Sequence, residues 1–355
     1  MQPYVPGTSI EEVQRRLGLA RVTKLASNEN PLGSSPKAMA ALAHVDRLHL
    51  YFDDAHTALR ERLGAAYGLQ AANVVLGHGS NELIALACQT MLEAGDEAVM
   101  ATPSFLLYPL AVALRGATAI EVPLRDGVHD PGGLLDAITG RTKLLFVCDP
   151  NNPTGTALTP AQWNDFLPRV PERVTVIVDQ AYREYMDAGT FDAARTVAQR
   201  PGTIVLRTMS KIYGLASLRF GYGFGDEETI GWLNRVRLPF NVSRPAALGA
   251  MGALDDEAFV ARSIAANGEG KAAVFGALER LGLHAYPTQA NFYAVEVPVS
   301  AARAYEDLLA RGLITRSGDA LGMPRRLRVT IGTAEQNADL VRALETLLPL
   351  WSGAQ

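Results

Sequence analysis

Two patterns of apolar positions alternate along the first two thirds of the chain. Short, fully apolar runs predict buried strands, and segments with an apolar residue every three or four positions predict helices that cover them. The expected strands are residues 73–76, 97–100, 118–122, 143–148, 174–178 and 203–206. The expected helices are residues 57–67, 83–92, 108–115, 134–138 and 160–167. This order predicts an α/β fold with a mostly parallel central sheet covered by helices.

The pattern changes in the last third. Helical periodicity runs through residues 231–254 around a break at 238–241, and again through 257–281. Expected strands at 290–297, 313–316 and 327–331 then mix with expected helices at 301–310 and 334–347. We therefore expect a large α/β domain at residues 36–258 and a small α+β domain at 259–355.

Residues 1–35 are expected to form an N-terminal arm, because prolines interrupt them and only residues 10–17 are amphipathic. An arm of this kind needs a surface on which to dock, and this favours a homodimer.

Composition narrows the class of protein. The 355 residues are 48% hydrophobic and 20% charged, which suits one large or two medium globular domains. The net charge of −4 disfavours a nucleic-acid partner. Cys88 and Cys148 lie inside apolar runs and are expected to be buried thiols of a reducing compartment. No secretory signal or membrane-spanning run is evident, so we expect a cytoplasmic protein without a membrane partner, and we expect no metal site.

Polar clusters follow the predicted strands at the points where the strands end. They are residues 77–81, Ser104-Phe105, Asn151-Asn152, residues 179–182 and Ser210-Lys211. Each cluster alone is compatible with an ordinary turn. Because ligands of parallel sheets bind at the carboxyl ends of the strands, the convergence of five clusters on one edge predicts a binding site there.

The cluster at residues 77–81 is a glycine-containing turn that leads into a helix. Such a turn presents free backbone N–H groups and a positive helix end, which suits an anion. It also suits a plain capped helix with Ser80 as the N-cap, and both interpretations stay open. Glu82 stands where a dinucleotide-binding motif needs its third glycine, so that motif is not expected.

Lys211 lies between an apolar strand and a segment, residues 221–225, that is too rich in glycine for a helix. An ammonium group is costly to bury, but in a protected pocket its pKa falls and the amine can form a Schiff base. Thr208, Ser210 and Arg219 supply hydroxyl and guanidinium groups that suit a phosphate. Taken alone, the segment also fits a surface lysine near a surface arginine.

Asp179 follows a fully apolar strand, where a carboxylate needs a cationic partner. The protonated pyridine nitrogen of pyridoxal 5'-phosphate (PLP) is one such partner. Tyr182 and Asn152 are candidate donors to the ring oxygen, and Phe105 is a candidate to stack on the ring. Ordinary interpretations stay open for Asp179 as an N-cap, Tyr182 as a helix-face residue and Phe105 as a core residue.

Three motifs together resemble the class I/II aminotransferases, which are PLP-dependent enzymes of fold type I. The motifs are Asn152-Pro153-Thr154-Gly155, Asp179-Gln180-Ala181-Tyr182, and Ser210-Lys211 with Arg219. The resemblance implies that Lys211, Asp179 and Tyr182 are catalytic, with Lys211 holding PLP as a Schiff base. It also implies that Asp179 meets the pyridine nitrogen, and that Asn152 and Tyr182 meet the ring oxygen. The implied phosphate-binding residues are Ser80, Asn81, Thr208, Ser210 and Arg219.

Within this group the chain resembles the histidinol-phosphate aminotransferases over nearly its full length. The segments that carry this resemblance are residues 3–7, 25–33, 239–242, 289–292 and 327–333. It implies a ping-pong transamination of L-histidinol phosphate with 2-oxoglutarate, yielding glutamate, in histidine biosynthesis, with Lys211 as the proton shuttle. It further implies that Arg328 and Arg316 bind the anionic end of the substrate and that Tyr4 and Asn30 line its pocket. Tyr51 would reach the cofactor phosphate of the partner subunit in a homodimer.

The chain departs from the family pattern at four positions. Phe105, Asn81, Phe52 and Ser243 stand where tyrosine, aspartate, proline and asparagine are usual. None of these changes removes a catalytic group, but they leave the substrate preference open. The alternatives are an aromatic amino-acid aminotransferase and, on the same fold, a phosphoamino-acid decarboxylase.

Overall fold

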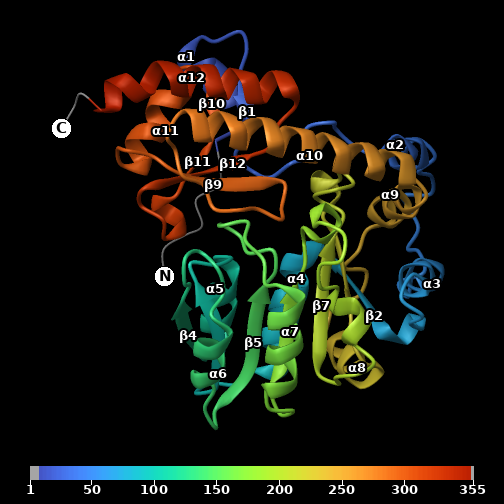
Figure 1. Ribbon diagram of the computed structural model, residues 1–355. Coiled ribbons are helices and arrows are strands. Elements are labelled where there is room, and N and C mark those ends of the chain that lie inside the picture. The colour runs from blue at the N-terminus through green and yellow to red at the C-terminus, as the bar shows by residue number, and fades with distance from the viewer. Residues whose placement is uncertain (1–7, 353–355) are drawn as a thin grey trace.

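The computed structural model describes residues 8–352, and a seven-stranded sheet forms the centre of its larger part (Figure 1). The strand order is β2-β8-β7-β6-β5-β3-β4. The strands are β2 (Val74–His78), β3 (Glu97–Thr102), β4 (Thr118–Pro123), β5 (Thr142–Cys148), β6 (Thr175–Asp179), β7 (Thr203–Thr208) and β8 (Phe220–Phe224). Neighbouring strands are parallel except at β8, which is antiparallel to β2 and β7. The predicted mostly parallel sheet is confirmed.

Both faces of this sheet are covered, and the central residues of inner strands such as β5, β6 and β7 are apolar and buried. In β6, for example, Val176 and Val178 belong to one core and Ile177 to the other. The first core includes side chains of α2 (Pro36–Leu42), α3 (Thr57–Ala65), α6 (Pro131–Asp136), α7 (Pro160–Phe166) and α9 (Arg244–Leu254). The second includes side chains of α4 (Gly79–Met91), α5 (Leu107–Ala113) and α8 (Glu227–Val236).

A smaller α+β part lies over the carboxyl edge of the sheet (Figure 1). Its three-stranded antiparallel sheet has the order β11 (Arg316–Ser317), β12 (Arg326–Thr330) and β9 (Phe292–Glu296). The helices α10 (Glu257–Arg280), α11 (Ala301–Leu309) and α12 (Ala334–Ser352) pack on it through a separate apolar core. The prediction of one strand at 313–316 is wrong. β10 (Leu313–Ile314) pairs with β1 (Thr23–Lys24), whereas β11 pairs with β12, so the chain changes partners at Thr315.

The described part of the N-terminal arm packs on the smaller part of its own chain through α1 (Ile10–Leu17) and β1. α1 contributes Val13 to an apolar cluster with Ala26, Leu309 and Ile314, and β1 pairs with β10. The domain boundaries at 35/36 and 258/259 and the homodimer stay predictions. Tyr4 lies outside the described residues.

The glycine-rich segment after Lys211 forms β8, which was not expected as a strand. Its aromatic residues Phe220, Tyr222 and Phe224 are buried, and the glycines between them face close neighbours. A Cβ atom on Gly221 would lie 2.3 Å from the backbone nitrogen of Ser80. Gly221 therefore permits the close approach of β8 to the first turn of α4, which begins at Gly79, four residues before the predicted start.

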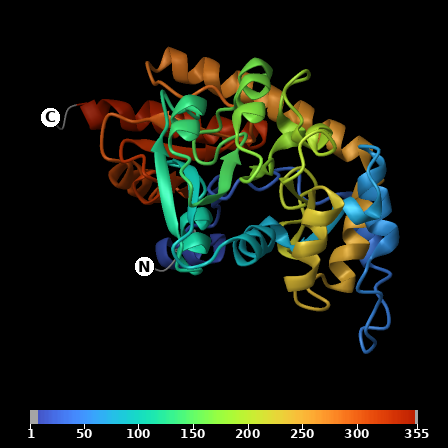
Figure 2. The ribbon, with the colours of Figure 1, turned by 90° about the horizontal axis from the view of Figure 1, so that it is seen from below.

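Three further features complete the description of residues 8–352. The segment between α2 and α3 projects from the body as a loop (Figure 2), and Tyr51 within it is 83% exposed. Cys88 and Cys148 are buried free thiols, as predicted. Within residues 8–352 no helix has the length and apolar character needed to cross a membrane.

Candidate active site

A cavity of about 240 Å³ opens where β5, β6 and β7 end at Cys148, Asp179 and Thr208. The structure brings most of the predicted site residues together there. Those that line the cavity are Ser80, Asn81, Phe105, Asn152, Asp179, Tyr182, Thr208, Ser210, Lys211, Arg219, Arg316 and Arg328. The strand ends predicted this convergence, while the role of each residue stays a prediction.

Lys211 lies in the turn that follows β7. The hydroxyl of Thr208 accepts the backbone N–H of Ser210 at 3.1 Å, which shapes this turn. The Lys211 Nζ donates to the carbonyl of Ser27 at 3.1 Å and lies 5.6 Å from the ring centre of Tyr182. Burial, and then the positive charge of Arg328, lower the pKa of Lys211 to about 8. A neutral amine is therefore accessible near physiological pH.

Asp179 is the last residue of β6 and is buried. Its Oδ2 accepts the hydroxyl of Tyr108 at 2.9 Å, and its Oδ1 accepts the N–H of Ala181 at 3.2 Å. Burial raises the pKa of Asp179 to about 6, because its effect exceeds the lowering of the pKa by these two hydrogen bonds from neutral donors. A carboxylate in this position is suited to a cation that enters the cavity.

The start of α4 brings to the cavity several groups that suit an anion. Helix α4 begins there with Ser80 and Asn81 in its first turn, and the side chain of its N-cap residue, His78, makes no capping hydrogen bond. Arg219 reaches the same turn, because Gly79 has φ +75° and lacks the Cβ that would lie 2.6 Å from the guanidinium Nη2. Backbone N–H groups, a helix end and a guanidinium group together suit a phosphate.

The smaller part of the chain contributes two guanidinium groups to the cavity. Arg316 on β11 and Arg328 on β12 are paired in register across the small sheet. Arg328 donates to the side-chain oxygen of Asn152 at 2.7 Å and to the carbonyl of Ala26 at 2.6 Å. Four cationic side chains thus line a cavity in which Asp179 is the lining carboxylate, and this charge balance favours ligands with more than one negative charge.

The loop before α2 contributes a residue that the sequence did not single out. Asn28 lines the cavity, and its Nδ2 donates to the hydroxyl of Tyr182 at 2.9 Å. Burial raises the pKa of Tyr182, so this hydroxyl keeps its proton. Asn30, which was predicted to line the substrate pocket, is not among the residues that line this cavity. Its amide donates instead to the carbonyl of Ile212 and to Ser263, which holds the segment next to Lys211.

Tyr108 was also missed, although a signal for it was present. It lies in the first turn of α5, three residues after Phe105, which precedes that helix, and the two rings meet edge to face at 5.6 Å. Tyr51 lies outside the cavity, with its ring 4.5 Å from that of Phe240, and its role at a partner's site stays a prediction. The part of the chain that the structure describes contains no cluster of side chains able to hold a metal ion.

Comparisons with known proteins agree with this geometry. Residues 20–344 match the model of the family described as aminotransferase class I and II. The histidinol-phosphate aminotransferase of Moorella thermoacetica is 46% identical over 351 residues, covering 98% of this chain and 91% of that protein. The histidinol-phosphate aminotransferase 2 of Carboxydothermus hydrogenoformans is 42% identical over 355 residues, covering 99% and 98%.

A solved structure shows the same fold. The histidinol-phosphate aminotransferase from Sinorhizobium meliloti, crystallised in complex with PLP, superposes with a TM-score of 0.89. The comparison covers 98% of this chain and 96% of that chain at 24% sequence identity. At this identity the likeness concerns the fold, which is that of the fold type I enzymes anticipated from the sequence motifs.

Proposed function

The chain belongs to the aminotransferase class I and II family, and from this premise we propose that it transfers the amino group of L-histidinol phosphate to 2-oxoglutarate with PLP as cofactor. The relatives named above, at 46% and 42% identity over nearly the whole chain, support this substrate. The observation that carries the proposal is the pairing of Arg316 with Arg328 in the cavity that also holds Lys211. Two guanidinium groups that line one cavity attract a ligand with more than one negative charge.

The residues of the cavity fit the proposed cofactor. Asp179 is a buried carboxylate whose hydrogen bonds come from neutral donors, and a pyridinium group is the cation that would match it. The turn at Ser80 and Asn81, with Arg219, would hold the phosphate, and Thr208 and Ser210 would add hydroxyl donors. Phe105 offers an aromatic face beside this position.

When bound, PLP supplies an electron sink that stabilises negative charge on the carbon bearing the amino group. Asp179 serves this chemistry by remaining ionised at neutral pH, since its pKa of about 6 lies below 7. Tyr182 remains a proton donor toward the ring oxygen, with Asn28 fixing the direction of its hydroxyl. Arg328 donates to the Oδ1 atom of Asn152 and so orients this amide. The Nδ2 group of Asn152 is then left as a second donor to the ring oxygen.

Lys211 is proposed to attach the cofactor and to move the proton during the reaction. With a pKa of about 8, its amine accepts and returns a proton at neutral pH without a large cost in either direction. A positioned base of this kind contributes roughly 10²–10⁴-fold to the rate. The carbonyl of Ser27, 3.1 Å from Nζ, holds the amine on the side of the cavity that faces Tyr182.

Arg328 and Arg316 are proposed to select the substrate. The phosphate of histidinol phosphate and the distal carboxylate of 2-oxoglutarate or glutamate are anions that both fit a guanidinium fork. The same pair can therefore serve both halves of a ping-pong reaction.

The test is an assay with histidinol phosphate and 2-oxoglutarate that follows glutamate formation, run beside phenylalanine as the alternative donor. We expect kcat/KM for histidinol phosphate to exceed that for phenylalanine at least about tenfold, because phenylalanine has no phosphate to contact Arg316 and Arg328. Equal values would favour an aromatic aminotransferase. Release of CO₂ from a phosphoamino acid would point to the decarboxylase instead. We also propose a homodimer in which Tyr51 reaches the partner, to be checked by solution mass.

A further inference from the structure

The segment Pro239-Phe240-Asn241-Val242 is not explained by the chemistry above, because none of its residues lines the active-site cavity. Asn241 nevertheless contacts the first turn of α4, whose residues Ser80 and Asn81 line that cavity. Its Nδ2 donates to the carboxylate of Glu82 at 2.7 Å and to the carbonyl of Leu76 at 3.2 Å. Glu82 lies in the first turn of α4, next to Ser80 and Asn81.

Glu82 in turn holds the start of the turn. The same oxygen that accepts from Asn241 also accepts the backbone N–H of His78 at 2.6 Å. His78 is the N-cap residue of α4, and its own side chain does not cap the helix. The carboxylate is thus fixed toward the strand side of the turn, between His78 and Asn241.

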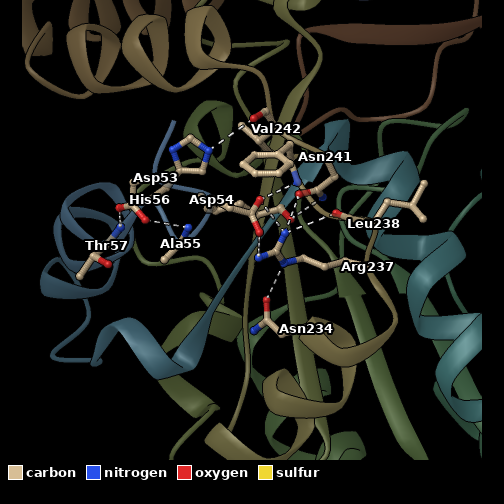
Figure 3. Close-up of polar contacts among 12 residues, drawn as sticks. Asp53, Asp54, Ala55, His56, Thr57, Asn234, Arg237, Leu238, Asn241 and Val242 are labelled. Carbon is tan, nitrogen blue, oxygen red and sulfur yellow. Dashed lines mark hydrogen bonds and ion pairs between the residues drawn. The ribbon is translucent and has the colours of Figure 1, made fainter. Parts of the chain in front are cut away.

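The loop that carries Asn241 is itself held firmly (Figure 3). Arg237 and Asp54 form a bidentate ion pair, with Nη1–Oδ1 and Nη2–Oδ2 distances of 3.0 and 2.8 Å. Asp54 also accepts the backbone N–H of Phe240 at 2.6 Å. Arg237 further approaches the side-chain oxygen of Asn241 at 3.4 Å. These contacts leave the Nδ2 group of Asn241 directed at Glu82.

We propose that Asn241 and Glu82 are positioning residues for the phosphate of PLP. A carboxylate in the first turn of a helix is attracted to the same free N–H groups that bind an anion. If Glu82 were not tied to Asn241 and His78, it would compete with the phosphate for the amides of Ser80 and Asn81. Asn241 therefore keeps the helix end open for the phosphate and holds the turn against β8. The turn has no spare room on that side, since a Cβ atom on Gly221 would lie 2.3 Å from the backbone nitrogen of Ser80.

This inference rests on the proposed function, since it assumes that the phosphate of PLP binds at the start of α4. Its test compares PLP with pyridoxal, which lacks the phosphate. The full-length chain is stripped of cofactor and titrated with each compound, and the ratio of the two dissociation constants isolates the contribution of the phosphate. A general loss of structure would weaken both compounds alike.

We expect Asn241→Ala to weaken PLP binding about tenfold, the equivalent of one hydrogen bond to a charged group, and pyridoxal binding less than about twofold. Asn241→Asp keeps the side-chain volume and places a second carboxylate against Glu82, so it should show the same selective loss if the alanine variant folds poorly. In a Glu82→Gln background the effect of Asn241→Ala should shrink, because the two residues act through one contact.

Asn73→Ala is the matched control. Asn73 donates to the carbonyl of Gly225 at 3.1 Å, just before the start of β2 and therefore at the opposite end of that strand from the turn. Its loss should leave the ratio unchanged. The inference is overturned if Asn241→Ala and Asn241→Asp leave the ratio of PLP to pyridoxal affinity as in the wild type. A wild-type chain that binds neither compound would instead contradict the proposed function.

Discussion

Asp179 is predicted to destabilise the cofactor-free protein, and Asp179→Asn tests this. Its carboxylate is buried with neutral donors around it, which suits a bound cation but leaves an unfavourable charge when none is present. Asparagine has nearly the same shape and carries no charge. The substitution should therefore raise the stability of the cofactor-free chain while it removes the partner of the pyridinium group.

The magnitude follows from the pKa of Asp179. Burial raises this pKa from 3.8 to about 6, and about two units correspond to about 3 kcal/mol. The folded-state pKa lies above the unfolded-state value, so the protonated carboxyl group costs no stability below pH 3.8. Ionisation lowers the free energy of unfolding as the pH rises, and this penalty is complete above pH 6. At pH 8 the wild type carries the full penalty, and at pH 5 it carries about half of it.

The assay is urea unfolding of the cofactor-free wild type and Asp179→Asn at pH 5 and pH 8. We expect the variant to be more stable at both values, with a difference that grows by about 1–2 kcal/mol between them. Addition of PLP should reverse the order, because only the wild type gains the ion pair. Equal stabilities at pH 8, or a difference that does not change with pH, would refute the reasoning.

Three further predictions concern single side chains of the site. Arg328→Gln should lower kcat/KM for histidinol phosphate about 10- to 100-fold, as expected for a lost charge-assisted contact, and unchanged steady-state kinetics would contradict its role. Gly221→Ala should weaken PLP binding and lower the free energy of unfolding by about 1–3 kcal/mol, since its Cβ would meet Ser80; unaltered titration and melting curves would speak against this tight fit. Tyr182→Phe should retain PLP but reduce kcat about tenfold, measured by glutamate formation. Full activity of this variant would exclude a role of the Tyr182 hydroxyl in the reaction.

The sequence predicted the fold because the local patterns and the tertiary structure agree. The central residues of strands such as β5 and β6 are apolar, as a sheet covered on both faces requires, and the helices α4, α5, α6 and α7 follow β2, β3, β4 and β5. The carboxyl ends of parallel strands meet at one edge, so Asp179 and Lys211 could be placed together without any contact information. The parts of the site on strand ends were therefore accessible from the sequence.

The remaining parts depend on contacts that are distant in the sequence. The strand β8 was not expected, because its glycines serve close packing and not a turn. Gly221 packs against Ser80, which lies more than 140 residues earlier in the chain (221 − 80), and Gly223 packs against Val75 and Val205. Asn28 and Asn30 are two residues apart in one polar loop, and only the fold decides that Asn28 faces the cavity while Asn30 faces Ile212. The change of strand partner at Thr315 likewise follows from tertiary pairing.

The central claim is that the amine of Lys211 holds the cofactor in the cavity that also contains Asp179 and Arg219. The most direct measurement is reduction of the PLP-loaded protein with borohydride, followed by digestion and mass analysis of the peptides. The account predicts one stably modified lysine, Lys211, and no modification in Lys211→Ala. Modification of another lysine in the wild type, with the Lys211 peptide unchanged, would contradict it.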